Sequence, residues 1–251
     1  MYAELRMEVE STQLDYRKSS NLQGVLMEKI DSSYAERLHE SQLNPYSQFL
    51  VDKGGQKFWH IMALNQEAYQ KIILPLAALE EFSLKNGQIK VNVIRRQIET
   101  CSEKTLLEEF YDKPGDRYLN IRFLTPTAFK QDGHYVNYPD LRLLFGSLMR
   151  KYSQASERLG MTDEETLDQL SKNCEIVKYH LRTAMFPLEK VNITGFVGTI
   201  CVHVRGTDTM ARYARLLLRF GKYTGVGIKA GIGMGATELL GREGMSSDSH
   251  R

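Results

Sequence analysis

Residues 192–239 read NITGFVGTICVHVRGTDTMARYARLLLRFGKYTGVGIKAGIGMGATEL. Four patterns follow one another in this stretch: a strand (192–204), a helix (207–220), a glycine-rich segment (225–235) and a second strand (236–239). β-Branched and aromatic residues favour the first strand. A threonine or aspartate caps the start of the helix, and Gly221 follows its end. The stretch therefore predicts the closing half of a sheet that carries a helix.

The residues before this stretch complete one structural unit. Strand patterns occupy 118–124 and 175–185, and leucines at helical spacing fill 140–159. Residues 124–139 read as a hairpin tip between the first strand and the helix. Together with 192–239, these elements follow the order β-α-β-β-α-β.

The first half of the chain repeats that order. Strands are expected at 3–9, 46–51, 57–64 and from 89 onward, and helices at 22–38 and 66–82. Two such units in tandem predict an α+β protein with two ferredoxin-like domains. Their expected bounds are 1–115 and 116–241, and the polar residues 242–251 are expected to be a disordered tail.

Composition narrows the class of protein. Hydrophobic residues make up 42% and charged residues 25%, which are ordinary globular values. The net charge of +2 does not by itself indicate a nucleic-acid partner. The three cysteines are Cys101, Cys174 and Cys201. Their odd number and the lack of a C-x-x-C pair argue against a disulfide framework or a zinc site. With no signal peptide or membrane span in the sequence, we expect a soluble, cytoplasmic protein with no cofactor or metal.

The glycine-rich segment is the most informative motif. It holds five glycines in eleven residues and one lysine, Lys229. Glycine permits positive φ and close backbone approach, and backbone N–H groups with an ammonium suit a phosphodiester. Neither the ATP/GTP loop nor the dinucleotide fingerprint fits its sequence and position. The predicted anion-binding residues are Gly225, Gly227, Lys229, Gly233 and Gly235; the alternative is a glycine hairpin with no ligand.

One histidine has the setting of a proton-transfer group. His39 stands at the end of the first helical region, beside the Asn44-Pro45 turn. Imidazole gives and takes protons near neutral pH. The alternative is a solvated histidine that favours the helix dipole. No histidine pair has a metal-binding spacing, so any chemistry of His39 is expected to be metal-free.

Further cations suit a phosphate partner. Arg219, with Arg212 and Arg215, forms a stripe on the last helix that ends beside Lys222 and the glycine-rich segment. Lys130 stands on the hairpin tip near two tyrosines, a combination that suits single-stranded RNA. A solvated helix face and a plain turn are the alternatives.

Three stretches together resemble a known family. They are Leu38-His39-Glu40, TPTAFK (125–130) with YPDLR (138–142), and GVG…GMG within 225–235. The chain resembles, over residues 1–239, the CRISPR-associated endoribonucleases that cut precursor CRISPR RNA within its repeats, most closely those of type III systems.

The resemblance implies a mechanism and partners. The RNA 2′-hydroxyl attacks the adjacent phosphorus, a histidine matched by His39 transfers a proton, and no metal takes part. The products carry a 2′,3′-cyclic phosphate and a 5′-hydroxyl. The implied partners are CRISPR repeat RNA and, transiently, effector-complex proteins; a homodimer is also allowed.

The chain departs from the family pattern at two positions. Met27 stands where many members have a tyrosine, and no lysine follows His39 closely. Tyr34 is a substitute for the tyrosine, and Lys53 or Lys229 for the lysine. The missing groups keep open a non-catalytic RNA-binding subunit of a CRISPR effector complex. A ligand-sensing ferredoxin-like module is a third alternative, and it predicts a pocket without a basic groove.

Overall fold

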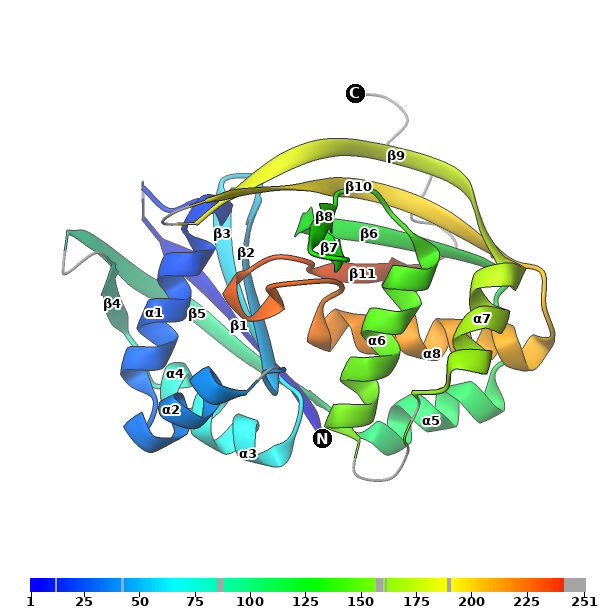
Figure 1. Cartoon of the computed structure of the whole chain (residues 1–251). Coiled ribbons are helices and arrows are strands. Elements are labelled where there is room, and N and C mark those ends of the chain that lie inside the picture. Colours follow the sequence, from blue (N-terminus) through cyan, green and yellow to red (C-terminus); the bar gives the residue numbers. More distant parts are fainter. Residues whose placement is uncertain are drawn as a thin grey trace.

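Two antiparallel sheets lie side by side in the computed structural model, each covered by helices (Figure 1). The structure describes residues 1–11, 13–41, 43–84, 88–156, 160, 162–188 and 191–241. The predicted tail, 242–251, lies outside the described residues. The mixed α+β class and the tandem ferredoxin-like arrangement are confirmed.

The N-terminal sheet has the order β2-β3-β1-β5-β4. Its strands are β1 (Tyr2–Glu10), β2 (Tyr46–Lys53), β3 (Gln56–Ala63), β4 (Glu81–Leu84) and β5 (Ile89–Cys101). Without the short edge strand β4, this is the strand order of a ferredoxin-like unit. Its helices are α1 (Ser19–Lys29), preceded by a 3₁₀ turn at Tyr16–Lys18, α2 (Ser32–Glu40), α3 (Gln66–Ala68) and α4 (Leu74–Ala77).

The C-terminal sheet has the order β11-β6-β10-β9, which is the same topology. Its strands are β6 (Tyr118–Thr127), β9 (Cys174–Pro187), β10 (Asn192–Val204) and β11 (Thr237–Leu240), and a small hairpin adds β7 (Phe129–Gln131) and β8 (His134–Val136). Its helices are α6 (Leu141–Ala155), α7 (Glu164–Asn173) and α8 (Asp208–Thr224). The β9–β10 ribbon arches over the molecule toward the N-terminal domain (Figure 1), where the Tyr16 hydroxyl donates to the Met185 carbonyl.

The expected helix 66–82 is wrong at its C-terminal end. The helical part stops at Ala77, after a π-helical turn at Tyr69–Ile73, and Phe82 belongs to β4. The Phe82 ring packs 5.3 Å from Trp59, centroid to centroid. A short apolar run does not separate strand from helix by its spacing, which is why Phe82 was assigned to the helix.

Two helices were not expected, α5 (Glu103–Asp112) and α7. Leu106 of α5 is buried in the C-terminal core. The buried Arg215 of α8 donates to the carbonyls of Glu109, Lys113 and Pro114 at the end of α5. The helix α5 therefore packs against α8 of the C-terminal domain, and the expected domain bound at 115 stays a prediction.

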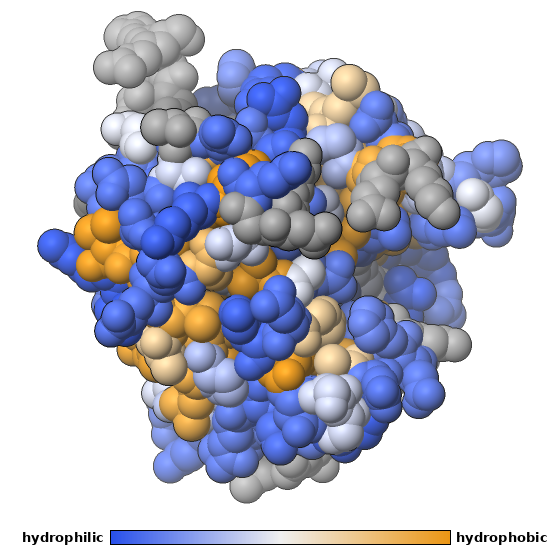
Figure 2. All heavy atoms as spheres, turned by 90° about the vertical axis from the view of Figure 1, so that its left-hand side faces the viewer, coloured by the Kyte–Doolittle hydropathy of each residue, from blue (hydrophilic) through white to orange (hydrophobic). Residues whose placement is uncertain are grey.

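The surface of the N-terminal side mixes apolar and hydrophilic residues (Figure 2). Ile94 and Ile98 of β5 are among the exposed large apolar side chains. Among the described residues, no helix combines the length and apolar character that a membrane span requires.

Candidate active cleft

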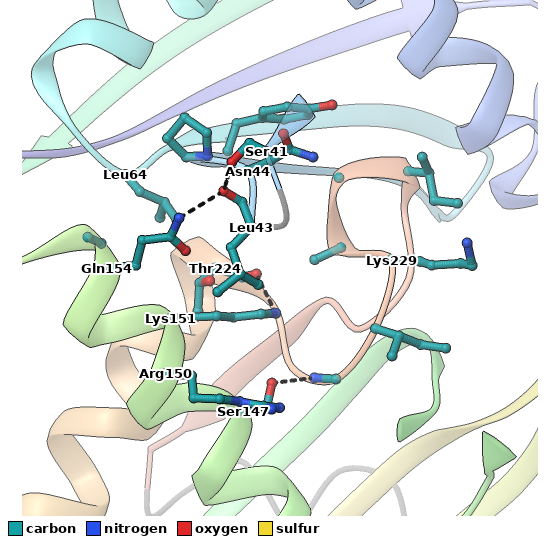
Figure 3. Close-up of a pocket in the computed structure, with 18 of the residues that line it drawn as sticks. Ser41, Leu43, Asn44, Leu64, Ser147, Arg150, Lys151, Gln154, Thr224 and Lys229 are labelled. Carbon is teal, nitrogen blue, oxygen red and sulfur yellow. Dashed lines mark hydrogen bonds between the residues drawn. The ribbon is translucent and has the colours of Figure 1, made fainter. Parts of the chain in front are cut away.

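A cavity of about 770 Å³ lies where the two domains meet. Three parts of the chain contribute most of its wall: the segment after α2, one face of α6, and the glycine-rich segment 225–235 after α8 (Figure 3). Gln23 of α1, Tyr46 of β2, and Leu64 and Asn65 after β3 also line the N-terminal side. We call this cavity the cleft.

One face of α6 ties the other two walls together. Ser147, Lys151 and Gln154 follow a spacing of four and three, which places them on one side of the helix. Ser147 Oγ accepts from the N–H of Gly227 at 3.0 Å. The Nε2 of Gln154 donates to the Leu43 carbonyl at 3.1 Å. The helix thus holds the glycine-rich segment and the segment that follows His39 (Figure 3).

Lys151, between these two residues, reaches the C-terminal end of α8. Its Nζ donates to the carbonyls of Thr224 at 3.2 Å and Gly225 at 3.0 Å. Burial, together with the nearby Arg150 guanidinium, lowers the pKa of Lys151 to about 7.

The predicted glycines have left-handed or otherwise positive φ. Gly225, Gly227, Gly233 and Gly235 all do, as does Lys229 at +58°. A Cβ at Gly227 would stand 2.2 Å from the Ala128 carbonyl oxygen, and one at Gly235 would stand 2.0 Å from that of Val226. Close contact within the chain therefore already requires glycine here.

The N–H groups of those four glycines have acceptors in the chain. They donate to Gly221 O, Ser147 Oγ, Ala230 O and Pro126 O respectively. These four N–H groups are therefore already paired within the chain. No acceptor among the described residues takes the N–H of Lys229, Ala230 or Gly231, and these three residues line the cleft. RNA contact with the segment stays a prediction.

His39 lies in the last turn of α2 and is exposed. Ser41, two residues on, lines the cleft, and its hydroxyl donates to the Leu43 carbonyl that Gln154 also holds. The structure therefore places the imidazole at the end of the helix that leads directly into the cleft wall. Its catalytic role stays a prediction.

Of the proposed substitutes for the family tyrosine and lysine, Lys229 lines the cleft, whereas Tyr34 and Lys53 do not. Tyr34 is buried, its hydroxyl has no hydrogen-bond partner among the described residues, and burial raises its pKa to about 12. Lys53 ends β2, the strand that leaves the cleft at Tyr46, and at about 3.3 Å per residue it lies roughly 23 Å away. The tyrosine at the cleft is Tyr46, whose hydroxyl accepts from Gln23 and whose pKa burial raises to about 12.

The other predicted cations are arranged differently from Lys229. Arg219 pairs with Glu109 of α5 at 2.8 Å, and Lys222 pairs with Glu4 of β1 at 2.7 Å. Arg215 is buried against α5, so the expected surface stripe on α8 serves largely to fasten these helices. Lys130 is exposed on β7. Lys229 is the one of these residues that lines the cleft.

The charge of the cleft has one sign. Its described lining includes three cationic side chains, Arg150, Lys151 and Lys229, and no carboxylate. Such a lining attracts anions. Within the described part of the chain, no group of three or more histidine, cysteine, aspartate or glutamate side chains is arranged to hold a metal ion.

Sequence reasoning missed Ser147, Lys151, Gln154 and Tyr46. The polar residues of α6 share a helix face at a spacing of four and three, but a solvated face has the same pattern. Nothing in the sequence marks that face as the one turned toward the glycine-rich segment.

Comparison with known proteins gives one consistent result. A family model described as CRISPR-associated endoribonuclease Cas6 matches residues 121–237. The chain is 36% identical over 220 residues to the CRISPR-associated endoribonuclease Cas6 of Streptococcus thermophilus, an alignment that covers 88% of this chain and 90% of that protein. It is 37% identical over 222 residues to the protein of the same name from Mycobacterium tuberculosis, covering 87% of this chain and 70% of that one.

Solved structures agree on the fold. A Cas6 product complex superimposes with a TM-score of 0.79 at 23% identity, covering 96% of this chain and 99% of the other. Thermus thermophilus Cas6 gives a TM-score of 0.72 at 21% identity and covers 96% of this chain and 98% of the other. On the sequence identity and coverage of its relatives, the chain belongs to the Cas6 family of CRISPR-associated endoribonucleases.

Proposed function

We propose that this enzyme cuts precursor CRISPR RNA within its repeats without a metal ion, at the cleft between its two domains. The observation that carries the proposal is the lining of the cleft. Among the described residues, three basic side chains and no carboxylate line it, beside the helix end that bears His39. A polyanion is attracted there, and a divalent metal lacks the oxygen ligands that it prefers.

The proposed reaction is an internal transfer. The 2′-oxygen forms a bond to the adjacent phosphorus while the bond from phosphorus to the 5′-oxygen breaks. The 2′-hydroxyl loses its proton and the 5′-oxygen gains one, leaving a 2′,3′-cyclic phosphate and a 5′-hydroxyl. His39 takes part in this proton transfer, because it is the exposed imidazole at the helix end leading into the cleft.

Lys229 is proposed to contact the RNA backbone, together with the turn Lys229–Gly231. Its ammonium is exposed, and the N–H groups of this turn have no acceptor among the described residues. Lys130 extends the proposed track along the β7–β8 hairpin, next to the exposed Tyr135. Arg219 and Lys222 carry less of the proposal, since carboxylates of the chain already pair with them.

Purified protein incubated with repeat RNA in EDTA tests the proposal. We expect cutting in EDTA, products with a cyclic phosphate at the 3′ end, and an intact strand when the cut site carries a 2′-deoxy sugar. Loss of cutting in EDTA that magnesium restores would show a metal mechanism. Cutting of the 2′-deoxy strand would exclude attack by the 2′-hydroxyl.

A second candidate function is a non-catalytic RNA-binding subunit of an effector complex. It is favoured by the burial of Tyr34, which leaves the family tyrosine without its expected substitute, and by the remoteness of Lys53, one of the two expected substitutes for the lysine. It predicts repeat binding with no cut product in the same assay.

The protein partners, cellular location and CRISPR type of this enzyme are also matters of proposal. Transient contact with effector-complex proteins and a homodimer stay proposals. The three cysteines are free thiols, which fits the proposed location in the reducing cytoplasm. Assignment to a type III system stays a prediction.

A further inference from the structure

Lys151 is a cation within the cleft that no carboxylate of the described residues neutralises. Figure 3 shows it extending from α6 toward Thr224, inside the cavity. The Lys151 side chain is partly buried, and taking its charge out of water without a charged partner is costly. Its position therefore calls for a reason.

Its hydrogen bonds leave room for a ligand. An ammonium carries three N–H donors and no acceptor. Two of these donors go to the carbonyls of Thr224 and Gly225. One N–H remains for a group that enters the cleft, and an anionic oxygen is the acceptor that also offsets the charge.

The same bonds connect Lys151 to the glycine-rich segment. Gly225 begins that segment, and Ser147, one turn away on α6, accepts from its third residue, Gly227. A ligand bound to Lys151 would therefore contact the same ammonium group that holds Gly225, the first residue of the glycine-rich segment.

We propose that Lys151 is an RNA-contacting residue: its ammonium binds a phosphodiester oxygen in the cleft while it holds the Thr224 and Gly225 carbonyls. The proposal rests on RNA being the substrate of this cleft. It assigns to α6, in the C-terminal domain, a cationic contact that the segment after His39 does not supply.

A consequence concerns protons. The pKa of Lys151 is about 7 in the free protein, since burial and then Arg150 disfavour its charge. The other ionisable groups that line the cleft are Arg150 on α6, Lys229 on the glycine-rich segment and Tyr46 on β2, with no described carboxylate among them. A phosphate beside the amine raises its pKa, so binding takes up a proton at pH 7.5, where part of the amine is neutral.

The test compares Lys151→Met with Ser147→Ala, both in a His39→Ala background that removes the proposed cutting and one titrating histidine. Ser147→Ala is the matched control, because it loosens the same glycine-rich segment without removing charge. Affinity for repeat RNA is measured against salt, and proton uptake by calorimetry at pH 7.5 in two buffers of different ionisation enthalpy.

We expect Lys151→Met to weaken RNA binding about tenfold, as for loss of a hydrogen bond to a charged group. The slope of log affinity against log salt should fall by about 0.7, and the proton uptake should decrease. Ser147→Ala should change neither the slope nor the uptake. Melting temperatures of both variants show that they are folded.

An unchanged salt slope and unchanged proton uptake in Lys151→Met would overturn the proposal, even where affinity falls, because a purely structural lysine predicts that result. The failure of the proposed function looks different. In that case the parent protein leaves repeat RNA uncut or fails to bind it, whatever residue stands at 151.

Discussion

His39 is the residue on which the proposed chemistry depends most. It is exposed in the last turn of α2, so its replacement removes a proton-transfer group without disturbing the core. His39→Ala should lower the single-turnover cleavage rate by about 10²–10⁴ and leave RNA affinity within a few-fold. Glu40→Ala, at the exposed neighbouring position, is the control and should cut at the normal rate. An undiminished cleavage rate in His39→Ala would show that this histidine is only a solvated residue at the end of the helix.

Tyr34 shows how a buried position alters the role that a residue type suggests. Its hydroxyl is buried without a partner, and the guanidinium carbon of Arg37 lies 5.1 Å from its ring centre. Tyr34→Phe keeps the ring and removes an unsatisfied polar group. We expect unchanged cleavage and about 1 kcal/mol more stability, measured by urea unfolding. A tenfold lower cleavage rate would instead indicate that Tyr34 takes part in catalysis.

At the scale of elements, the glycine-rich segment is defined by its packing. Gly233 has a φ of +115°, and a Cβ there would lie 2.3 Å from the Cβ of Ser19, the buried first residue of α1. Gly233→Val should therefore destabilise the protein by about 2 kcal/mol more than Gly54→Val, measured by thermal unfolding. Gly54 also has a positive φ, but open space surrounds its Cβ position, so it isolates the backbone strain. Equal losses would mean that contact with α1 contributes nothing.

The helix α6 is the element that joins the two sides of the cleft. Ser147 and Lys151 hold the glycine-rich segment, and Gln154 holds Leu43. The sequence predicted the helix from its leucines, which form its buried face. The sequence did not assign a role to the polar face, because its spacing is the same whether its side chains face solvent or bind distant backbone groups.

At the scale of the whole molecule, a charged cluster joins the two domains. Glu4 of β1 accepts from His60 Nδ1 and from Lys222 of α8, each at 2.7 Å. Burial alone would raise the pKa of Glu4, but the hydrogen bonds from His60 and Lys222 lower it to about 2. A lowered carboxyl pKa stabilises the folded state above the unfolded value, near 4.5.

That stabilisation is lost as the pH falls from about 5 toward 2. Glu4→Gln should therefore lower the free energy of unfolding at pH 7 by about 3 kcal/mol, as for a broken buried pair. It should also flatten the acid side of the stability profile, measured by urea unfolding at several pH values. Lys90→Gln, which breaks a pair with Glu81 on the exposed surface, is the control and should change stability by less than about 1 kcal/mol. An unaltered acid profile in Glu4→Gln would show that the cluster does not govern acid stability.

The sequence by itself determined the order of the core strands and helices in each domain, but not the helices α5 and α7 or the edge strand β4. Apolar spacing and local turn signals depend on neighbours along the chain, so the tandem β-α-β-β-α-β order is present in them. The same holds for Thr207, whose hydroxyl accepts from Met210 N at the start of α8. The family motifs around His39 and Lys229 are likewise local, so both residues were predicted as site residues without a structure.

Only the tertiary structure decided which side chains share the cleft and which charges are already paired. Arg215 and Arg219 have the sequence pattern of an exposed stripe. In the structure, Arg215 donates hydrogen bonds to backbone carbonyls at the end of α5, and Arg219 forms an ion pair with a carboxylate of α5. Lys151 has the pattern of a solvated lysine, yet it lies in the cleft against the end of α8. The physical reason is that these contacts join residues about 70 to 110 positions apart in the sequence. The pattern of neighbouring residues does not encode which distant elements will meet.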